Sequence, residues 1–182
     1  MTTFVALLRA VNVGGTGKLP MAELTAMCAA LGFVRVRTYI ASGNVVFDSD
    51  RDAASVKAAL EARLAAHAGK PVAVYVRTGP EMAAVLAANP FPDAAPERTL
   101  VIFLDAPPPA DALDHAKHRT SERLALGARE IYVDYRDRET MAGSRLAIPA
   151  TACGTARNMN TVAKLTQMAS GSCELLAATD RS

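Results

Sequence analysis

A glycine-rich stretch at residues 12–20, NVGGTGKLP, lies between an apolar run and a helical pattern, which is where nucleotide hydrolases carry their phosphate-binding loop. That loop requires the pattern GxxxxGK followed by Ser or Thr. When Gly17 and Lys18 are aligned with its GK pair, Asn12 occupies the place of the first glycine. Leu19 then occupies the place of the hydroxyl residue that binds Mg²⁺. The sequence therefore predicts that the protein is not a P-loop NTPase.

The same bend gathers hydrogen-bond donors without a carboxylate to balance them. Its three glycines are explained by a sharp turn from a strand into a helix. Four polar residues lie between positions 9 and 18, namely Arg9, Asn12, Thr16 and Lys18. A turn alone does not require them, so they favour a binding site for an anion, with a purely structural bend as the alternative.

The segment ARNMNTVAKL at 156–165 places a second group of donors at the start of the last predicted helix. The unpaired N–H groups and partial positive charge of a helix N-terminus attract anions. Arg157 is unfavourable in that field unless a negative group lies nearby. One residue among Asn158, Asn160 and Thr161 is enough for an ordinary helix cap. An anion site and a capped helix with a solvated arginine stay open as alternatives.

The composition limits the class of partner. The chain has 182 residues with 20 basic and 18 acidic side chains, and its net charge of +2 is too small for a general nucleic-acid coat. Aromatic residues make up 5% and Trp is absent, so stacking platforms for bases are few. The sequence has no secretory signal and no apolar run of about 18 residues, so we expect no membrane association. Three widely spaced cysteines favour reduced thiols and a cytoplasmic location.

Other residues that could carry chemistry give weaker signals. His115 and His118 are spaced to share a helical face as metal ligands, but no third ligand is nearby in the sequence. Cys153 has arginines near it in the sequence but no histidine to act as its base. The sequence therefore predicts no metal site, assigns no catalytic residue and leaves any cofactor unknown.

Hydrophobic periodicity predicts the elements that position these groups. In residues 1–78 they are a strand at 3–8, a helix from Pro20 to Gly32, a hairpin at 34–48 with its turn at 42–44, a helix between Asp50 or Asp52 and Gly69, and a strand at 71–77. Alternation in the first hairpin strand predicts that Val34, Val36 and Ile40 share its buried face. This βαββαβ order predicts a ferredoxin-like half within an α+β protein.

The pattern in residues 79–182 predicts a second α+β half, packed on the first in one compact unit. Its expected elements are a helix through about Ala88, a strand at 99–105, a polar helical segment near 111–119, a hairpin around Gly127, and a last helix that starts near Asn158 or Asn160 and ends at Gly171. Residues 136–157 have no clear class. We interpret this half as an incomplete version of the first.

The chain also resembles the bacterial DUF1697 family, a group of proteins of unknown function. The resemblance rests on ALLRAVNVGG…K at 6–18, TYIASGNVVF at 38–47, NPF at 89–91, RLALGAREIYV at 123–133 and ARNMNTVAKL at 156–165. It implies an α+β fold of two ferredoxin-like halves, in agreement with the periodicity. It implies no reaction, substrate or cofactor.

The family's segments carry a shared set of polar residues. By matching position these are Arg9, Asn12, Lys18, Ser42, Asn44, Arg157, Asn158, Asn160, Thr161 and Lys164. They are donors, amides and hydroxyls, without an acid, histidine or cysteine, so general acid–base chemistry is not indicated. Our hypothesis is that the two halves bring them together in one pocket for a phosphate or carboxylate group. For Ser42 and Asn44 the alternative is that they simply build the hairpin turn.

The sequence thus predicts an uncharacterised cytoplasmic protein that binds an anionic small molecule. A module for RNA or single-stranded nucleic acid is a weaker alternative, because it rests on fold analogy. Two further alternatives are an enzyme that acts on a phosphorylated metabolite and a scaffold that binds another protein. The oligomeric state does not follow from the sequence.

Overall fold

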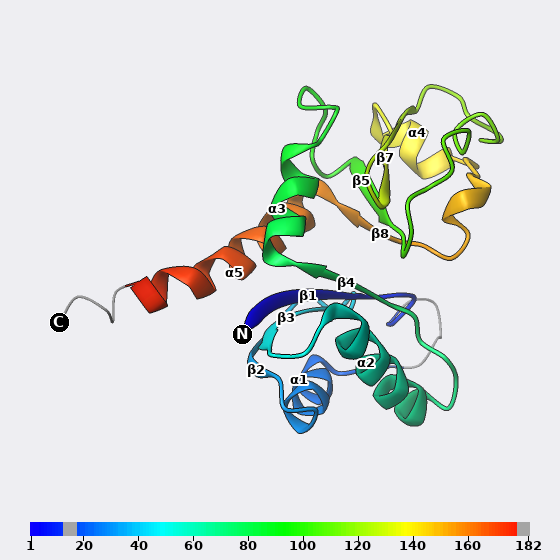
Figure 1. The fold of residues 1–182 in the computed structure, drawn as a ribbon. Coiled ribbons are helices and arrows are strands. Elements are labelled where there is room, and N and C mark those ends of the chain that lie inside the picture. The colour runs from blue at the N-terminus through cyan, green and yellow to red at the C-terminus, as the bar shows by residue number, and fades with distance from the viewer. Residues whose placement is uncertain (13–17, 178–182) are drawn as a thin grey trace. The chain divides into compact units, whose positions relative to one another are not determined.

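The computed structural model describes residues 1–12 and 18–177, with side chains as far as residue 171. The chain divides into two units, of which the first comprises Met1–Ala83 and the residues from Lys164 onward. The second unit comprises Ala84–Ala163. Each contains one four-stranded antiparallel sheet, and the ribbon is shown in Figure 1.

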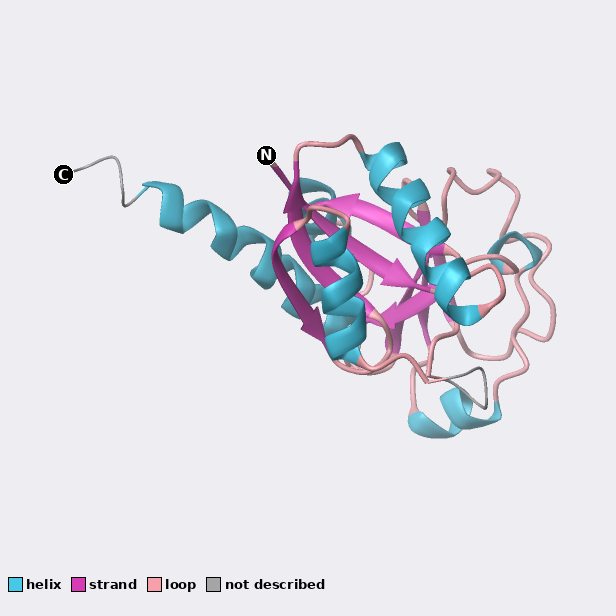
Figure 2. Ribbon diagram, turned by 90° about the horizontal axis from the view of Figure 1, so that it is seen from below, coloured by secondary structure: helices cyan, strands magenta, loops and turns pink. Residues whose placement is uncertain are grey.

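The first unit has the predicted order of elements. They are β1 (Thr2–Leu8), α1 (Met21–Ala30), β2 (Val34–Tyr39), β3 (Asn44–Ser49), α2 (Ala53–Ala68) and β4 (Val74–Thr78). The strands lie side by side in the order β2-β3-β1-β4. Both helices cover one face of this sheet, and Figure 2 shows them lying over the strands. Their apolar stripes, which include Leu24 and Leu60, pack on alternate residues of β1 such as Phe4 and Leu8.

Local signals in the sequence set the helix ends of this unit. Asp52 is the N-cap of α2, and its carboxylate accepts a hydrogen bond of 2.8 Å from the backbone N–H of Ser55. Gly69 ends the helix with a φ of 67°, the left-handed conformation that glycine adopts without strain. Pro20 is the N-cap of α1 rather than its first helical residue.

The predicted burial of β2 is wrong at two positions. Val34 is 41% exposed and Ile40 is 50% exposed. The register between β2 and β3 shifts between Val34 and Arg37, and Arg35 has a positive φ of 50°, as in a β-bulge. A bulge moves side chains to the other face of a strand, so simple alternation does not hold there.

The second unit repeats the sheet of the first with different connections. Its elements are β5 (Thr99–Phe103), β6 (Arg123–Leu126), β7 (Glu130–Asp134), α4 (Arg138–Gly143), a short 3₁₀ helix (Pro149–Thr151) and β8 (Thr155–Asn158). The strand order β6-β7-β5-β8 matches that of the first sheet. Two further helices, α3 (Gly79–Ala87) and α5 (Met159–Ala177), each include residues of both units.

Three features of this half differ from expectation. The segment 111–119 forms successive turns rather than a helix, with hydrogen bonds such as the one from Asp114 N to Asp111 O. The stretch 136–157, which had no predicted class, contains α4 and the start of β8. The last helix continues through Gly171 to Ala177, because a single glycine lowers helix stability only by about 1 kcal/mol.

The registers of the two sheets are equivalent. Val5 of β1 faces Arg77 of β4, and at the same place in the second sheet Val101 faces Arg157. Thr3 faces Asp48 in the first sheet, just as Thr99 faces Asp134 in the second. The protein therefore consists of two ferredoxin-like halves, the second being a variant in which turns replace the first helix.

A buried carboxylate in each sheet is held by an arginine of the neighbouring strand. Asp48 is 1% exposed and accepts hydrogen bonds from Arg35 Nε and from Thr3 Oγ1, the latter at 2.6 Å. Asp134 is also 1% exposed, and Arg123 Nε donates to it at 2.7 Å. A buried charge is tolerated only when it is paired, so each ion pair holds its hairpin in one register.

Glu122 holds together the irregular part of the second unit. Its side chain is 1% exposed and accepts hydrogen bonds from Thr120 N at 2.7 Å and from Ser144 Oγ at 2.7 Å. Burial alone would raise the pKa of Glu122, but the hydrogen bonds from Ser144 and Thr120 lower it to about 2. The ionised carboxylate therefore ties the segment before β6 to the segment after α4.

We predict that Glu122→Gln lowers the free energy of unfolding at neutral pH by on the order of 2 kcal/mol. The pKa of Glu122 is lower in the folded protein than its ordinary value of 4.5, so its contribution is present above pH 4.5 and is lost as the pH falls towards 2. Urea unfolding of both proteins from neutral to acid pH should give a difference that shrinks with acidification. A difference that stays constant over this range would contradict the assignment.

Candidate functional site

The ten predicted site residues are divided between the two units. Arg9, Asn12, Lys18, Ser42, Asn44 and Lys164 belong to the first unit, and Arg157, Asn158, Asn160 and Thr161 belong to the second. Residues 13–17, which include Thr16 and the three glycines of the bend, lie outside the described residues. That all ten residues meet in one pocket stays a prediction.

Asn12 clamps the two described ends of the bend after β1. Its Nδ2 donates to the carbonyl oxygen of Leu19 at 2.9 Å and to that of Ala41 at 2.7 Å. Its Oδ1 accepts from the backbone N–H of Leu19 at 2.7 Å. Asn12 has a φ of 56°, a conformation that asparagine tolerates better than most residues. The side chain therefore joins the end of β1, the start of α1 and the hairpin turn.

Ser42 and Asn44 form part of that hairpin turn. Asn44 is fully buried, and its Nδ2 donates to the carbonyl oxygen of Tyr39 and to Ser42 Oγ, both at 3.0 Å. Gly43 between them has a φ of 80°, and a Cβ at this position would lie 2.9 Å from Leu8 Cβ. The turn therefore requires glycine and packs closely on the end of β1. Both hydrogens of the Asn44 amide are used within the turn.

A cavity of about 220 Å³ lies beside the clamped bend. Its apolar lining includes Val11 and Leu64, and its polar lining consists of Lys18, His67 and Lys70. Among the predicted site residues, Lys18 is the one that lines it. Two lysines and an imidazole around an apolar surface can hold an anionic group through charge and hydrogen bonds.

Two negative features lie next to this cavity. His67 Nδ1 lies 3.1 Å from Glu23 Oε1, so the carboxylate of α1 contacts the imidazole of α2. The last turn of α2 also ends here, and the carbonyl end of a helix carries a partial negative charge. The attraction of an anion to Lys18 and Lys70 must therefore outweigh its repulsion by Glu23 and by the end of α2. The two full charges of the lysines exceed the single charge of Glu23 and the roughly half charge of the helix end together.

Two of the predicted residues of the second unit, Arg157 and Asn158, have structural roles. Arg157 on β8 is 8% exposed, and its Nη1 donates to Thr155 Oγ1 at 2.9 Å and to the carbonyl oxygen of Ala156 at 2.8 Å. Burial lowers the pKa of Arg157 to about 10, so it stays protonated at neutral pH. Asn158 Oδ1 accepts from the backbone N–H of Thr161 at 2.9 Å, the geometry of an ordinary helix cap.

Sequence reasoning missed two kinds of polar residue. Arg77 is 2% exposed at the position equivalent to Arg157, and its Nη1 donates to the carbonyl oxygen of Val76 at 3.0 Å. Comparing the two halves strand by strand could have found this pair. His67 and Lys70 were missed because they lie at the far end of α2, where no sequence pattern connects them with the bend after β1.

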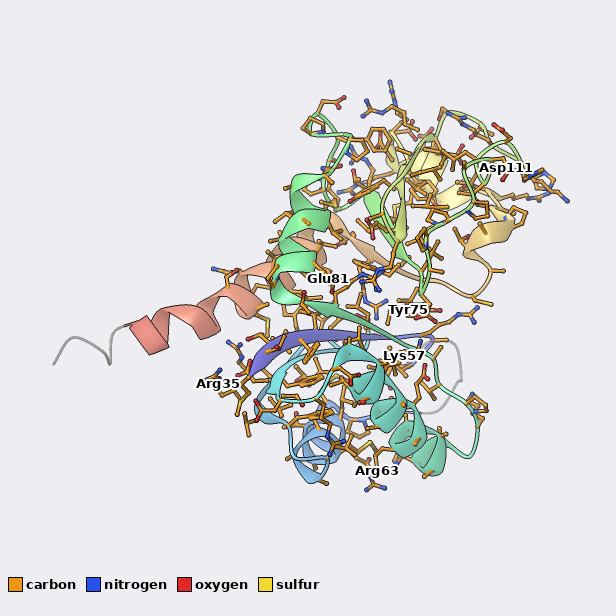
Figure 3. All side chains as sticks on the ribbon, in the orientation of Figure 1. Arg35, Lys57, Arg63, Tyr75, Glu81 and Asp111 are labelled. Carbon is orange, nitrogen blue, oxygen red and sulfur yellow. The ribbon has the colours of Figure 1, made fainter. Side chains whose placement is uncertain are left out.

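Side chains of α2 close the outer edge of β4. Glu61 accepts from the backbone N–H of Val74 at 3.0 Å, and Lys57 donates to the carbonyl oxygen of Val74 at 3.0 Å. The Lys57 ammonium also lies 5.4 Å from the ring centre of Tyr75, and Figure 3 shows the two side chains close together. These bonds satisfy outward-facing backbone groups of an edge strand and so oppose pairing with another chain there.

The fold and the equivalent registers define an α+β protein with two ferredoxin-like halves. The chain belongs to the family described as "Protein of unknown function (DUF1697)", whose model matches residues 1–132. None of the curated proteins matches it. Among solved structures it is similar to the conserved bacterial protein SP0830 from Streptococcus pneumoniae, with 25% identity and a TM-score of 0.76. That match covers 93% of this chain and 98% of SP0830.

The structure also bears on the weaker chemical signals. Cys28 is buried in the core of the first unit, and burial raises the pKa of its thiol to about 12, which makes it unreactive. His115 Nε2 lies 3.2 Å from Asp111 Oδ2 on the surface. In the part of the chain that the structure describes, no three His, Cys, Asp or Glu residues are grouped to hold a metal ion. In the same part, no helix has the length and apolar character needed to cross a membrane.

We predict that Asn12→Gly lowers the free energy of unfolding by about 1–3 kcal/mol, because the two backbone groups of the buried residue Leu19 and the carbonyl group of Ala41 lose their partner. Glycine adopts the positive φ freely, so this variant separates the hydrogen bonds from backbone strain. Urea unfolding measures the loss, and Asn160→Gly near the start of α5 reports the ordinary cost of a helix glycine. An Asn12→Gly protein as stable as the wild type would show that the clamp contributes nothing.

Proposed function

We propose that the protein binds a small anion, with a phosphate or carboxylate group, in the cavity beside Lys18. The observation that carries this proposal is the lining of that cavity by Lys18, His67 and Lys70 around an apolar surface. Both lysine side chains are exposed, so their ammonium groups reach solvent and an incoming ligand. Lysine binds phosphate as a point charge with three rotatable donors.

The size of the cavity limits the ligand. Sites for drug-sized ligands have volumes of roughly 300–1,000 Å³. A cavity of about 220 Å³ is smaller, which favours an inorganic anion or a short metabolite over a nucleotide. Val11, Leu64 and Val72 can receive a few carbon atoms next to the anionic group.

Asn12 serves this proposal as a positioning residue. Its hydrogen bonds to both backbone groups of Leu19 fix the residue that directly follows Lys18. A fixed backbone lowers the conformational entropy that Lys18 loses when it meets a ligand. Of the ten predicted site residues, the proposal thus uses Lys18 to supply positive charge and Asn12 to position Lys18. Direct contact of the other eight residues with a ligand stays a prediction.

Location and chemistry belong to the same proposal. A cytoplasmic bacterial protein agrees with a buried, unreactive thiol at Cys28 and with the bacterial source of SP0830. The polar lining of the cavity consists of two lysines and one histidine in contact with Glu23, and the proposal assigns no reaction to them.

We predict that inorganic phosphate or a short carboxylate such as malonate raises the midpoint of thermal unfolding. A ligand at about a hundred times its dissociation constant adds roughly 2.7 kcal/mol, which is a shift of several degrees. The double substitution Lys18→Gln with Lys70→Gln should abolish this shift. Lys117→Gln is the matched control, because Lys117 is an exposed lysine that does not line the cavity and is not among the predicted site residues.

Two outcomes would contradict the proposal. The first is a wild-type protein that no phosphate or carboxylate stabilises. The second is a shift that survives in the double variant Lys18→Gln with Lys70→Gln. A short RNA included in the same assay tests the nucleic-acid alternative, which requires an affinity that falls steeply with salt.

A further inference from the structure

A second cavity, of about 400 Å³, lies in the second unit, and none of the ten predicted site residues lines it. One wall is the segment before β6, with His118, Arg119 and Thr120. The other wall is α4 and the residues after it, which Figure 1 shows as one short helix and its following loop. This wall contributes Glu139, Thr140, Ser144 and Arg145. Every lining residue except Gly143 thus has a polar side chain, although carbon atoms supply most of the lining surface.

The two walls are joined at three places without any ligand. Lys117 and Ala147 exchange backbone hydrogen bonds of 2.8 and 3.0 Å at one end. Glu122 accepts from Thr120 on one wall and from Ser144 on the other. The hydroxyl groups of Ser121 and Thr140 lie 3.1 Å apart. The cavity is therefore formed before a ligand arrives, which reduces the entropy lost on binding.

The charges on the walls do not neutralise each other directly. Within the described residues, no hydrogen bond or ion pair involves the side chain of Arg145 or of Glu139. Arg119 donates from Nε to the carbonyl oxygen of Glu122 at 3.0 Å, which holds its guanidinium in place. Opposite charges that line one cavity without pairing leave both signs available to a ligand.

The balance of charge decides the class of ligand. Among the residues that line the cavity, Arg119 and Arg145 carry two positive charges and Glu139 carries one negative charge. A simple anion is attracted by the two arginines but repelled by Glu139. A small molecule that carries a carboxylate and an ammonium group gains at both ends, because guanidinium binds carboxylate and Glu139 accepts from ammonium.

We propose that this cavity binds a zwitterionic small molecule with the chemistry of a free α-amino acid. Arg145 and Arg119 receive its carboxylate, and Glu139 receives its ammonium group. This site is independent of the anion site in the first unit, since no residue lines both cavities.

The test is binding of the twenty L-amino acids, each at millimolar concentration, measured first by thermal unfolding and then by calorimetry for those that shift the midpoint. We expect at least one amino acid to bind, and we expect its amine and carboxylic acid analogues, which lack one charged group, to bind at least tenfold more weakly. Arg145→Gln and Glu139→Gln should each raise the dissociation constant at least tenfold.

Arg138→Gln is the matched control, because Arg138 is an exposed arginine of α4 that does not line the cavity. Arg145 and Glu139 are also exposed, so their substitution leaves stability within about 0.5 kcal/mol and the variants fold. The Lys18→Gln and Lys70→Gln double variant should keep its response to the amino acid, which separates this proposal from the anion site. The proposal is overturned if no amino acid binds, or if binding is unchanged in Arg145→Gln and Glu139→Gln.

Discussion

Each sheet of this protein depends on one buried carboxylate that has to meet an arginine on the neighbouring strand. Asp48 meets Arg35 in the first unit, and Asp134 meets Arg123 in the second. A slip of one residue would move the carboxylate to the other face and leave it unpaired, which costs several kcal/mol. The ion pairs therefore favour these hairpin registers, in which β3 pairs with the central strand β1 and β7 pairs with the central strand β5.

The polar residues of the family segments divide into those that build the fold and those that remain open to a ligand. The amides of Asn12, Asn44 and Asn158 are engaged with backbone groups at chain reversals and at a helix start. A buried backbone group without a hydrogen-bond partner costs free energy. Residues with side-chain amides are therefore expected wherever the backbone turns inside a compact unit. Charged side chains that line cavities are the better guide to binding, and in the first unit these are Lys18 and Lys70.

Most of the first half could be predicted from its sequence because its signals are local. The cap at Asp52 and the stop at Gly69 act within one helical turn of the element they define. The bulge at Arg35 and the irregular second half could not be predicted, because they depend on distant partners such as the Glu122 to Ser144 hydrogen bond. Of the two lysines of the proposed anion site, Lys18 could be predicted from the bend, whereas Lys70 is brought to it by the packing of α2.

The central claim is that the positive charges of Lys18 and Lys70 bind a small anion in the cavity that these residues line. The most direct test is a titration of ¹⁵N-labelled full-length protein with inorganic phosphate, followed by amide chemical shifts at constant ionic strength. The account predicts saturable shifts at Val11, Lys18 and Leu19 and at His67 and Lys70, on both sides of the cavity. Shifts that are absent there, or that rise linearly without saturation across the whole surface, would contradict it.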